Sequence, residues 1–327
     1  MQSNDLMLEL LKMAVSLSTL ALSSHVAIKN AIRVSESTGV SRSSIGFTLI
    51  AVSTSLPELA VAISSAISGT AAVSVGNVLG SNVANVFLIA GLGLFFASFT
   101  SKVEIYKFKP EELDFLYFGI FIASAVPLIL VSLLPASRFV GGLLVALYAY
   151  YTFKIVFRKG IENPTTELQV KFVKHSRVAP FVVFTLLGVA GVVLSSHFLV
   201  ESTVNVALSL SVPESLISAT VVAVGTSLPE LALDLQAFLK GEPGLAFGDM
   251  IGSNFTNTTL ILGATLLLSP ININIKAFYD LATFSILANI VLWYLMSRGK
   301  FGRMEGIYLL SSYILFLASI MGLLAFG

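Results

Sequence analysis

The sequence predicts an all-α membrane protein that crosses the bilayer many times, and its composition, its apolar runs and an internal repeat support this prediction. Of the 327 residues, 56% are hydrophobic and only 11% are charged, against about 25% charged residues in an average soluble protein. The mean hydropathy is +0.91. This exceeds what one core of this length can bury, so lipid must cover much of the surface.

Ten apolar runs are long enough to form membrane-spanning helices, each of which needs about 20 mostly apolar residues. They cover residues 6–28, 45–69, 72–99, 114–134, 137–156, 178–200, 212–239, 243–269, 276–297 and 304–326. The sequence therefore predicts a polytopic membrane protein with ten transmembrane helices.

The basic residues predict how these helices are oriented. All but three of the 19 Lys and Arg residues lie in the segments that follow odd-numbered spans. Because Lys and Arg concentrate in cytoplasmic loops, we expect both termini outside, in a multi-pass protein of the plasma membrane. The segment 158–177 carries Pro164 and mixed charges, so we expect a cytoplasmic linker there. It would join a first domain over residues 1–157 to a second over residues 178–327.

The two halves of the chain share two motifs at one ungapped offset of 172 residues. Residues 51–60 (AVSTSLPELA) match residues 223–232 (AVGTSLPELA) at nine of ten positions. Residues 76–85 (GNVLGSNVAN) match residues 248–257 (GDMIGSNFTN) at five of ten. A repeat that served packing alone would keep Leu, Gly and Ala, whereas this one also keeps Thr, Ser, Pro and Glu. Because the copies lie five crossings apart, we expect two inverted five-helix repeats, whose interface is where secondary transporters bind substrate.

The first motif predicts a helix break followed by a carboxylate at membrane depth. Pro57 and Pro229 have no N–H and cannot continue the helical hydrogen bonds, so each helix should break there. Glu58 and Glu230 follow directly. An ionised Glu at the bilayer centre costs about 3 kcal/mol, and no Lys or Arg lies near the middle of any predicted span. Bound cations or protons must therefore neutralise the pair.

The second motif adds neutral oxygen donors. Ser81 and Asn85, like Ser253 and Asn257, are four residues apart and share one helical face. Such residues often only pack helices together, but facing a carboxylate they are candidate cation ligands. An all-oxygen set without His or Cys favours Na⁺, Ca²⁺ or Mg²⁺.

Calcium fits this oxygen set better than magnesium. Ca²⁺ takes about six to eight oxygens, whereas Mg²⁺ keeps much of its water. Two bidentate glutamates and the backbone carbonyls of Thr54 and Thr226 would supply six oxygens. Two negative charges would also balance one divalent ion.

With both motifs in inverted copies, the chain resembles the α-repeats of the sodium/calcium exchangers, in the calcium/cation antiporter superfamily, and among them a compact prokaryotic-type member. The resemblance covers both repeats and nearly the whole topology. It implies exchange of about three Na⁺ for one Ca²⁺, with the first and sixth helices sliding across a fixed bundle. It implies Ca²⁺ ligands at Glu58, Glu230, Thr54 and Thr226. It implies Na⁺ sites at Ala51, Ser55, Ser81, Ala223, Ser227 and Ser253 that share Glu58 and Glu230, with Asn85 and Asn257 as a central polar pair.

Departures from the family pattern refine this expectation. Potassium-dependent relatives carry Asp where this chain has Asn257, so the resemblance implies a potassium-independent exchanger. Ser53 replaces the Gly of the usual first motif. The central segment is too short for the calcium-sensing domains of animal members.

Other functions remain open to different degrees. An exchanger of H⁺ for Ca²⁺ could use the same glutamates, although the Ser hydroxyls of both motifs favour Na⁺, since a proton needs no such ligands. A cation channel is less favoured, because a filter usually forms around an axis between subunits or loops. The sequence contains no nucleophile paired with a base and no His cluster, so it does not predict an enzyme. We expect no cofactor, no nucleic-acid partner at a net charge of +1, and no identifiable protein partner; the expected partners are Ca²⁺, Na⁺ and the lipid bilayer.

Four titratable residues receive no firm role. Asp234, one turn after Glu230, could extend the cation path or be a charge near a helix end. Asp249 matches Asn77 in the first copy and is equally open. His25 and His197 occupy equivalent positions and could either make polar contacts near helix ends or titrate near neutral pH.

Overall fold

The computed structural model describes residues 3–38, 54–99, 110–132, 137–162, 178–241, 243–269 and 275–322. The regular elements in these ranges are helices. In the first half they are α1 (Ser3–Thr38), α3 (Leu56–Ile67), α4 (Ala71–Val83), the π-helix η1 (Ala84–Ala90), α5 (Gly91–Ala97), α6 (Pro110–Ser132) and α7 (Arg138–Glu162). In the second half they are α8 (Val178–Leu210), α9 (Glu214–Ile217), η3 (Ser218–Val222), α10 (Ala223–Thr226), α11 (Leu228–Lys240), α12 (Pro243–Thr256), η4 (Asn257–Ile261), α13 (Leu262–Leu268), α14 (Ile275–Arg298) and α15 (Arg303–Ile320).

The helices have the length and composition of a membrane protein. Within the described residues, five helical stretches are long and apolar enough to cross a bilayer, and a bent pair raises this number to six. They are Leu6–Ala27, Ala71–Ala97, Ala179–Leu210, Phe278–Arg298 and Arg303–Ile320, with Glu214–Thr226 and Leu228–Lys240 as the bent pair. The chain is therefore a polytopic α-helical membrane protein, and the count of ten spans stays a prediction.

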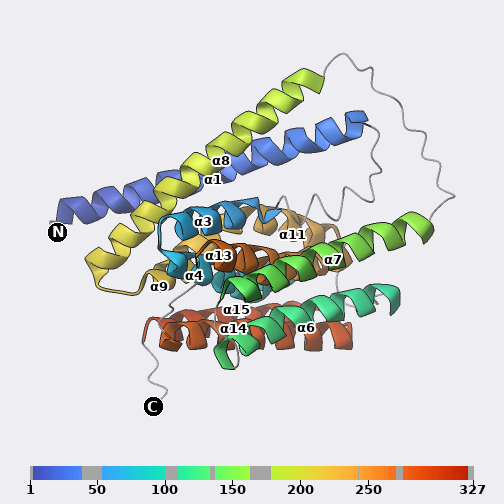
Figure 1. The fold of residues 1–327 in the computed structure, drawn as a ribbon. Coiled ribbons are helices and arrows are strands. Elements are labelled where there is room, and N and C mark those ends of the chain that lie inside the picture. Colours follow the sequence, from blue (N-terminus) through green and yellow to red (C-terminus); the bar gives the residue numbers. More distant parts are fainter. Residues whose placement is uncertain are drawn as a thin grey trace.

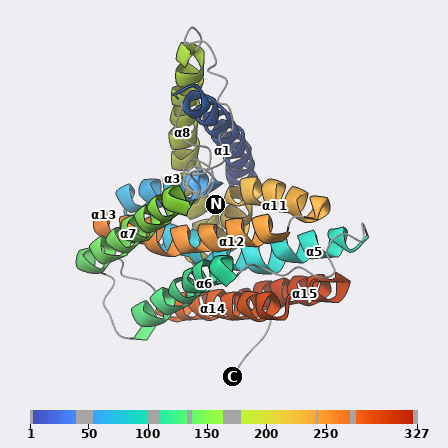
Figure 2. The same cartoon turned by 90° about the vertical axis from the view of Figure 1, so that its right-hand side faces the viewer.

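The helices form three layers (Figure 1). The long helices α1 and α8 lie side by side across one face. Turned by 90°, they stand above the other helices (Figure 2), and each packs mainly on the other. The middle layer holds α3, α4, α11, α12 and α13, while α6, α14 and α15 lie beneath it. The shorter helices that carry both motifs are thus enclosed between longer ones.

The outer pair α1 and α8 presents an apolar surface to its surroundings and a packed seam to the bundle. Leu22 and Leu194 are exposed, while Met13, Leu20 and Leu199 are buried in a common apolar cluster. This pattern fits helices that face lipid on one side. Both helices also run beyond their predicted spans, α1 to Thr38 rather than 28 and α8 to Leu210 rather than 200.

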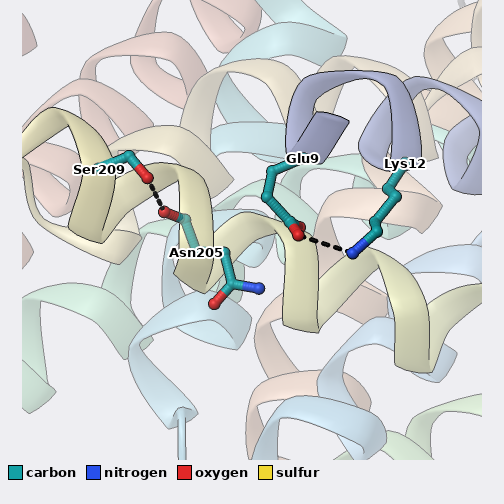
Figure 3. A network of polar contacts seen from close by, with 4 residues as sticks. All are labelled: Glu9, Lys12, Asn205 and Ser209. Atoms are coloured by element: carbon teal, nitrogen blue, oxygen red, sulfur yellow. Dashed lines mark hydrogen bonds and ion pairs between the residues drawn. The ribbon is translucent and has the colours of Figure 1, made fainter. Parts of the chain in front are cut away.

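One charged group lies in the seam between these two helices (Figure 3). Glu9 of α1 is buried and accepts a hydrogen bond from Lys12 Nζ at 2.7 Å. Asn205 of α8 lies beside the same carboxylate. Glu9 is therefore a buried acid whose charge is balanced within its own helix.

The predicted breaks at the prolines occur at equivalent points of the two copies. Ser227 separates α10 from α11 with φ −83° and ψ 14°, and the two stretches around it are bent by 53°. Ser55 precedes α3 with φ −82° and ψ 10°. Proline accounts for this geometry, because it supplies no N–H to the preceding turn and is well tolerated in the first turn of a new helix.

Small residues let α4 cross close to α9 and η3. A Cβ atom added to Gly76 would lie 2.4 Å from the carbonyl oxygen of Ser215, and one added to Gly80 would lie 2.4 Å from that of Ala219. Ser218 Oγ also donates to the carbonyl of Val73. Backbone therefore lies against backbone here, so a motif helix of the first half packs directly on the broken helix of the second.

Candidate cation site

Two glutamates begin the helices that follow the breaks. Glu58 lies in the first turn of α3 and Glu230 in the first turn of α11, and each is 1% exposed. The first turn of a helix favours a negative charge, because its free N–H groups carry partial positive charge. The sequence expectation that both carboxylates are buried is confirmed.

The carboxylate of Glu58 faces the motif of the other half of the chain. Ser227 Oγ donates a hydrogen bond to Glu58 Oε1 at 3.1 Å. The side chains of Thr226 and Ser81 also approach this carboxylate. Glu230 is close enough to Glu58 for the two groups to interact electrostatically. The TSLPE segments therefore meet across the interface between the halves.

No basic side chain compensates these two glutamates. Among the described residues, no Lys or Arg forms an ion pair with Glu58 or Glu230, and Oε2 of each has no hydrogen-bond partner there. Burying an uncompensated charge costs several kcal/mol, at order of magnitude. The pair therefore requires protons or cations when it is enclosed. In the same part of the chain, no three Asp, Glu, His or Cys side chains gather as a metal site.

Neutral oxygens from both copies surround the glutamates. Thr54 Oγ1 lies 3.5 Å from Ser253 Oγ, which joins the first motif of one copy to the second motif of the other. Ser81, the equivalent of Ser253, also contacts the opposite copy, since its Oγ donates to the carbonyl of Ala223 at 3.5 Å. Ser55 is buried, and its Oγ has no partner among the described residues. Ser227 belongs to the same group of neutral oxygens, because its Oγ donates to Glu58 Oε1.

Two of the expected Na⁺ ligands, Ala223 and Ala51, have no side-chain oxygen and could bind a cation only through their backbone carbonyls. Ala223 is fully buried, and its carbonyl also accepts from Thr226 Oγ1 at 3.2 Å. Thr226 Oγ1 lies 3.0 Å from Asn77 Oδ1 as well. Ala51, the equivalent of Ala223, lies outside the described residues, as does Ser53.

The expected central pair, Asn85 and Asn257, is buried, and each amide is held by an asparagine of the opposite copy. Asn85 Nδ2 donates to Asn254 Oδ1, and Asn257 Nδ2 donates to Asn82 Oδ1, both at 3.0 Å. The sequence analysis did not single out Asn82 and Asn254. The signal that could have found them is the third letter of the repeated GSN motif.

Two further aspartates, Asp234 and Asp249, are buried near Glu230. Asp234 is fully buried in the middle of α11, so the interpretation as a charge near a helix end is wrong. Asp249 of α12 is also buried, and both interact electrostatically with Glu230. His25 and His197, by contrast, are exposed on α1 and α8. The two histidines therefore lie outside the cluster of buried oxygens.

Comparisons with a family model and with known relatives point to the same protein family. The family model described as "Sodium/calcium exchanger protein" matches residues 9–157 and 180–322. The chain is 30% identical over 313 residues to the putative antiporter CaxA of Alkalimonas amylolytica, covering 92% of this chain and 94% of the relative. It is 29% identical over 328 residues to the sodium/calcium exchanger MaX1 of Methanosarcina acetivorans, covering 89% and 92%.

Solved structures of the sodium-calcium exchanger NCX_Mj share the fold. One soaked with Na⁺ and Sr²⁺ has a TM-score of 0.63 at 24% identity, over 96% of this chain and 99% of the other. The family model covers most of the chain, and the relatives match along most of their own length. The family consists of membrane transporters that exchange Na⁺ and Ca²⁺ without a cofactor, and its members are not enzymes. The chain therefore belongs to the sodium/calcium exchanger family and is a multi-pass cation antiporter.

Proposed function

We propose that this chain exchanges Na⁺ for Ca²⁺ across the cell membrane by alternating access to one shared site. The observation that carries the proposal is the pair Glu58 and Glu230, which are buried, close enough to interact electrostatically and without a basic partner in the described part of the chain. Their two negative charges balance one Ca²⁺.

The proposed Ca²⁺ ligands are the carboxylates of Glu58 and Glu230 and the backbone carbonyls of Thr54 and Thr226. Both threonines lie at the helix breaks, where carbonyls are released from helical hydrogen bonds. Two bidentate carboxylates and two carbonyls give six oxygens, the lower end of what Ca²⁺ takes.

The proposed Na⁺ sites share the same carboxylates. Their proposed ligands are Ala51, Ser55 and Ser81 of the first copy, Ala223, Ser227 and Ser253 of the second, and both glutamates. The hydrogen bond of 3.1 Å from Ser227 Oγ to Glu58 Oε1 supports this sharing, because a hydroxyl beside a carboxylate is a suitable ligand for a hard monovalent cation. Asn257, a neutral amide, supports independence from K⁺.

Obligatory exchange follows from the charge of the site. An empty site would carry two uncompensated carboxylates through an enclosed state, at a cost of several kcal/mol. The loaded site avoids this cost, so only the loaded transporter changes its orientation. We propose α1 and α8 as the elements that slide, since they cover one face and pack mainly on each other (Figure 2).

The proposed architecture is two inverted five-helix repeats with ten transmembrane helices and both termini outside. The matching angles at Ser55 and Ser227 support two equivalent copies. So do the π-helices η1 and η4, which begin at Ala84 and Asn257, at nearly equivalent positions. The proposed domains are 1–157 and 178–327, joined by a cytoplasmic linker over 158–177, whose first residues continue α7 to Glu162.

The test is Ca²⁺ uptake into Na⁺-loaded proteoliposomes by the Glu58→Gln and Glu230→Gln variants. Each variant should lose at least about tenfold in rate, the equivalent of 1.4 kcal/mol, because one carboxylate and half of the compensating charge are removed. Glu305→Gln is the matched control: Glu305 also lies in a first helical turn, where it accepts from Gly302 N at 3.0 Å, and a Gln oxygen can keep this contact. Normal exchange by both site variants would overturn the proposal.

Exchange of H⁺ for Ca²⁺ is the alternative, because two protons would neutralise the same glutamates. The hydroxyls of Ser55 and Ser227 argue for Na⁺, since proton binding needs no additional oxygen ligands. Ca²⁺ uptake that follows a pH gradient in the absence of Na⁺ would favour H⁺ over Na⁺ as the counter-ion. Single-channel currents in a planar bilayer would instead favour a channel.

A further inference from the structure

Four asparagines of the second motif, in its two copies at residues 76–85 and 248–257, form two crossed pairs. Asn85 of the first copy donates to Asn254 of the second, and Asn257 of the second donates to Asn82 of the first. At the offset of 172 residues, Asn82 is the equivalent of Asn254, and Asn85 is the equivalent of Asn257. Both hydrogen bonds are 3.0 Å long and fully buried. The two pairs are therefore the same contact made twice, once in each direction.

The direction of the bond between Asn257 and Asn82 is determined by a backbone carbonyl. Thr258 Oγ1 donates its only proton to the carbonyl of Asn254, so towards Asn82 it can only accept. Asn82 therefore turns Nδ2 towards Thr258 Oγ1, at 3.2 Å. Its Oδ1 then faces Asn257, which must present Nδ2 in return.

The direction of the bond between Asn85 and Asn254 is determined in a similar way. Asn254 Nδ2 lies 3.5 Å from the backbone carbonyl of Asn82 and 3.2 Å from Asn289 Oδ1. A carbonyl oxygen can only accept, so Nδ2 of Asn254 faces that side. Its Oδ1 is left for Asn85, which must also present Nδ2.

Both central amides are thus held by their nitrogens. Oδ1 of Asn85 and Oδ1 of Asn257 are buried and have no hydrogen-bond partner among the described residues. Leaving a buried carbonyl unpaired is costly, unless it has another partner. Amide carbonyls are among the oxygen ligands that hard cations prefer.

We propose that Asn82 and Asn254 are positioning residues for cation binding. Each holds the amide of the opposite copy so that its carbonyl oxygen, and not its NH₂ group, faces the ion. This inference rests on the proposed function, because it takes Asn85 and Asn257 to face the transported ions.

Helix α14 anchors both pairs from outside the motifs. Asn289 accepts from Asn254, and Ser285, one turn earlier, accepts from Asn82 Nδ2 at 3.5 Å. The equivalent positions in the first copy are Leu113 and Tyr117 of α6. These two residues do not repeat the Ser and Asn acceptors of α14. A helix outside the repeated motifs therefore supports the orientation of ligands in both halves.

The first test is the Asn254→Leu variant, which removes the acceptor for Asn85 and keeps the same branched arrangement of heavy atoms. With its amide released, Asn85 can turn NH₂ towards the ion, so the Ca²⁺ concentration for half-maximal exchange should rise about 5- to 20-fold, the size of one lost buried hydrogen bond. The maximal rate should stay within about twofold. Ser74→Ala is the control, since this buried hydroxyl of α4 bonds to Thr265 Oγ1 at 2.6 Å, outside the two pairs. Equal half-maximal concentrations in both variants would overturn the proposal.

The second test separates orientation from structural support. In an Asn85→Asp background the side chain presents an oxygen whichever way it turns, so adding Asn254→Leu should change the half-maximal Ca²⁺ concentration less than about twofold. An equal rise in both backgrounds would contradict a positioning role. If Asn254→Leu does not assemble, Asn82→Leu with Asn257→Asp makes the same comparison on the other pair.

The two proposals fail in different ways. Normal exchange by both Glu58→Gln and Glu230→Gln would refute the proposed function itself. Loss of exchange in Glu58→Gln, with an unchanged half-maximal Ca²⁺ concentration in Asn254→Leu, would refute only the positioning role.

Discussion

Replacing Gly76 by Ala tests the close contact between α4 and the broken helix of the second half. The added Cβ atom would lie 2.4 Å from the carbonyl oxygen of Ser215, about 1 Å closer than a normal van der Waals contact. Both contacting groups are helical backbone, so relief requires the helices to separate. Overpacking of this kind costs about 1–3 kcal/mol, of which the better helix propensity of Ala returns up to about 1 kcal/mol.

The equivalent residue of the second copy supplies the control. Gly248 lies at the same motif position, but a Cβ atom added there meets nothing within 4 Å. Gly248→Ala should therefore leave stability unchanged or raise it by up to about 1 kcal/mol. We expect the two variants to differ by about 2 kcal/mol, or roughly 3 °C in the midpoint of thermal unfolding in detergent, followed by Trp and Tyr fluorescence. Equal midpoints would refute the assigned contact and its asymmetry between the copies.

Two further predictions concern motion and the helix break. Ser64 Oγ of α3 lies 2.8 Å from Ser196 Oγ of α8, and the chain contains no cysteine, so a Ser64→Cys, Ser196→Cys variant should form a disulfide on oxidation. If α8 slides, oxidation should lower the exchange rate at least about fivefold and reductant should restore it. Each single Cys variant is the control. Full exchange by the oxidised double variant would exclude the sliding. Pro229→Ala returns an N–H that can bond across the break, so we expect a straighter helix, at least about tenfold slower Ca²⁺ exchange and an unchanged or higher unfolding midpoint. Unaltered exchange would show that the break is dispensable.

The sequence predicts the features that follow from local chemistry. Pro229 predicts the break because a missing N–H interrupts any helix, and the structure bends there by 53°. Glu58 and Glu230 are predicted to be buried because each lies in an apolar run, and both are. The ends of α1 were predicted less well, since hydropathy marks the apolar part of a helix and not its polar continuation to Thr38.

The arrangement of the amides could not be predicted, because it depends on contacts between distant segments. Asn82 and Asn254 carry the same motif letter, but only the packing of α4 against η4 and α12 determines which amide each one holds. Asn289 shows no repeat signal at all, since its equivalent is Tyr117. The burial of Asp234 likewise follows from the helices around α11 and not from its neighbours in sequence.

The central claim is that the glutamate pair exchanges Ca²⁺ for Na⁺. The most direct measurement is uptake of radioactive Ca²⁺ into proteoliposomes containing the wild-type chain, with Na⁺, K⁺ and pH gradients imposed one at a time. We expect uptake with an outward Na⁺ gradient alone, no further dependence on K⁺, and no uptake with a pH gradient alone. Uptake that follows the pH gradient without Na⁺, or that proceeds without any counter-ion gradient, would contradict the account.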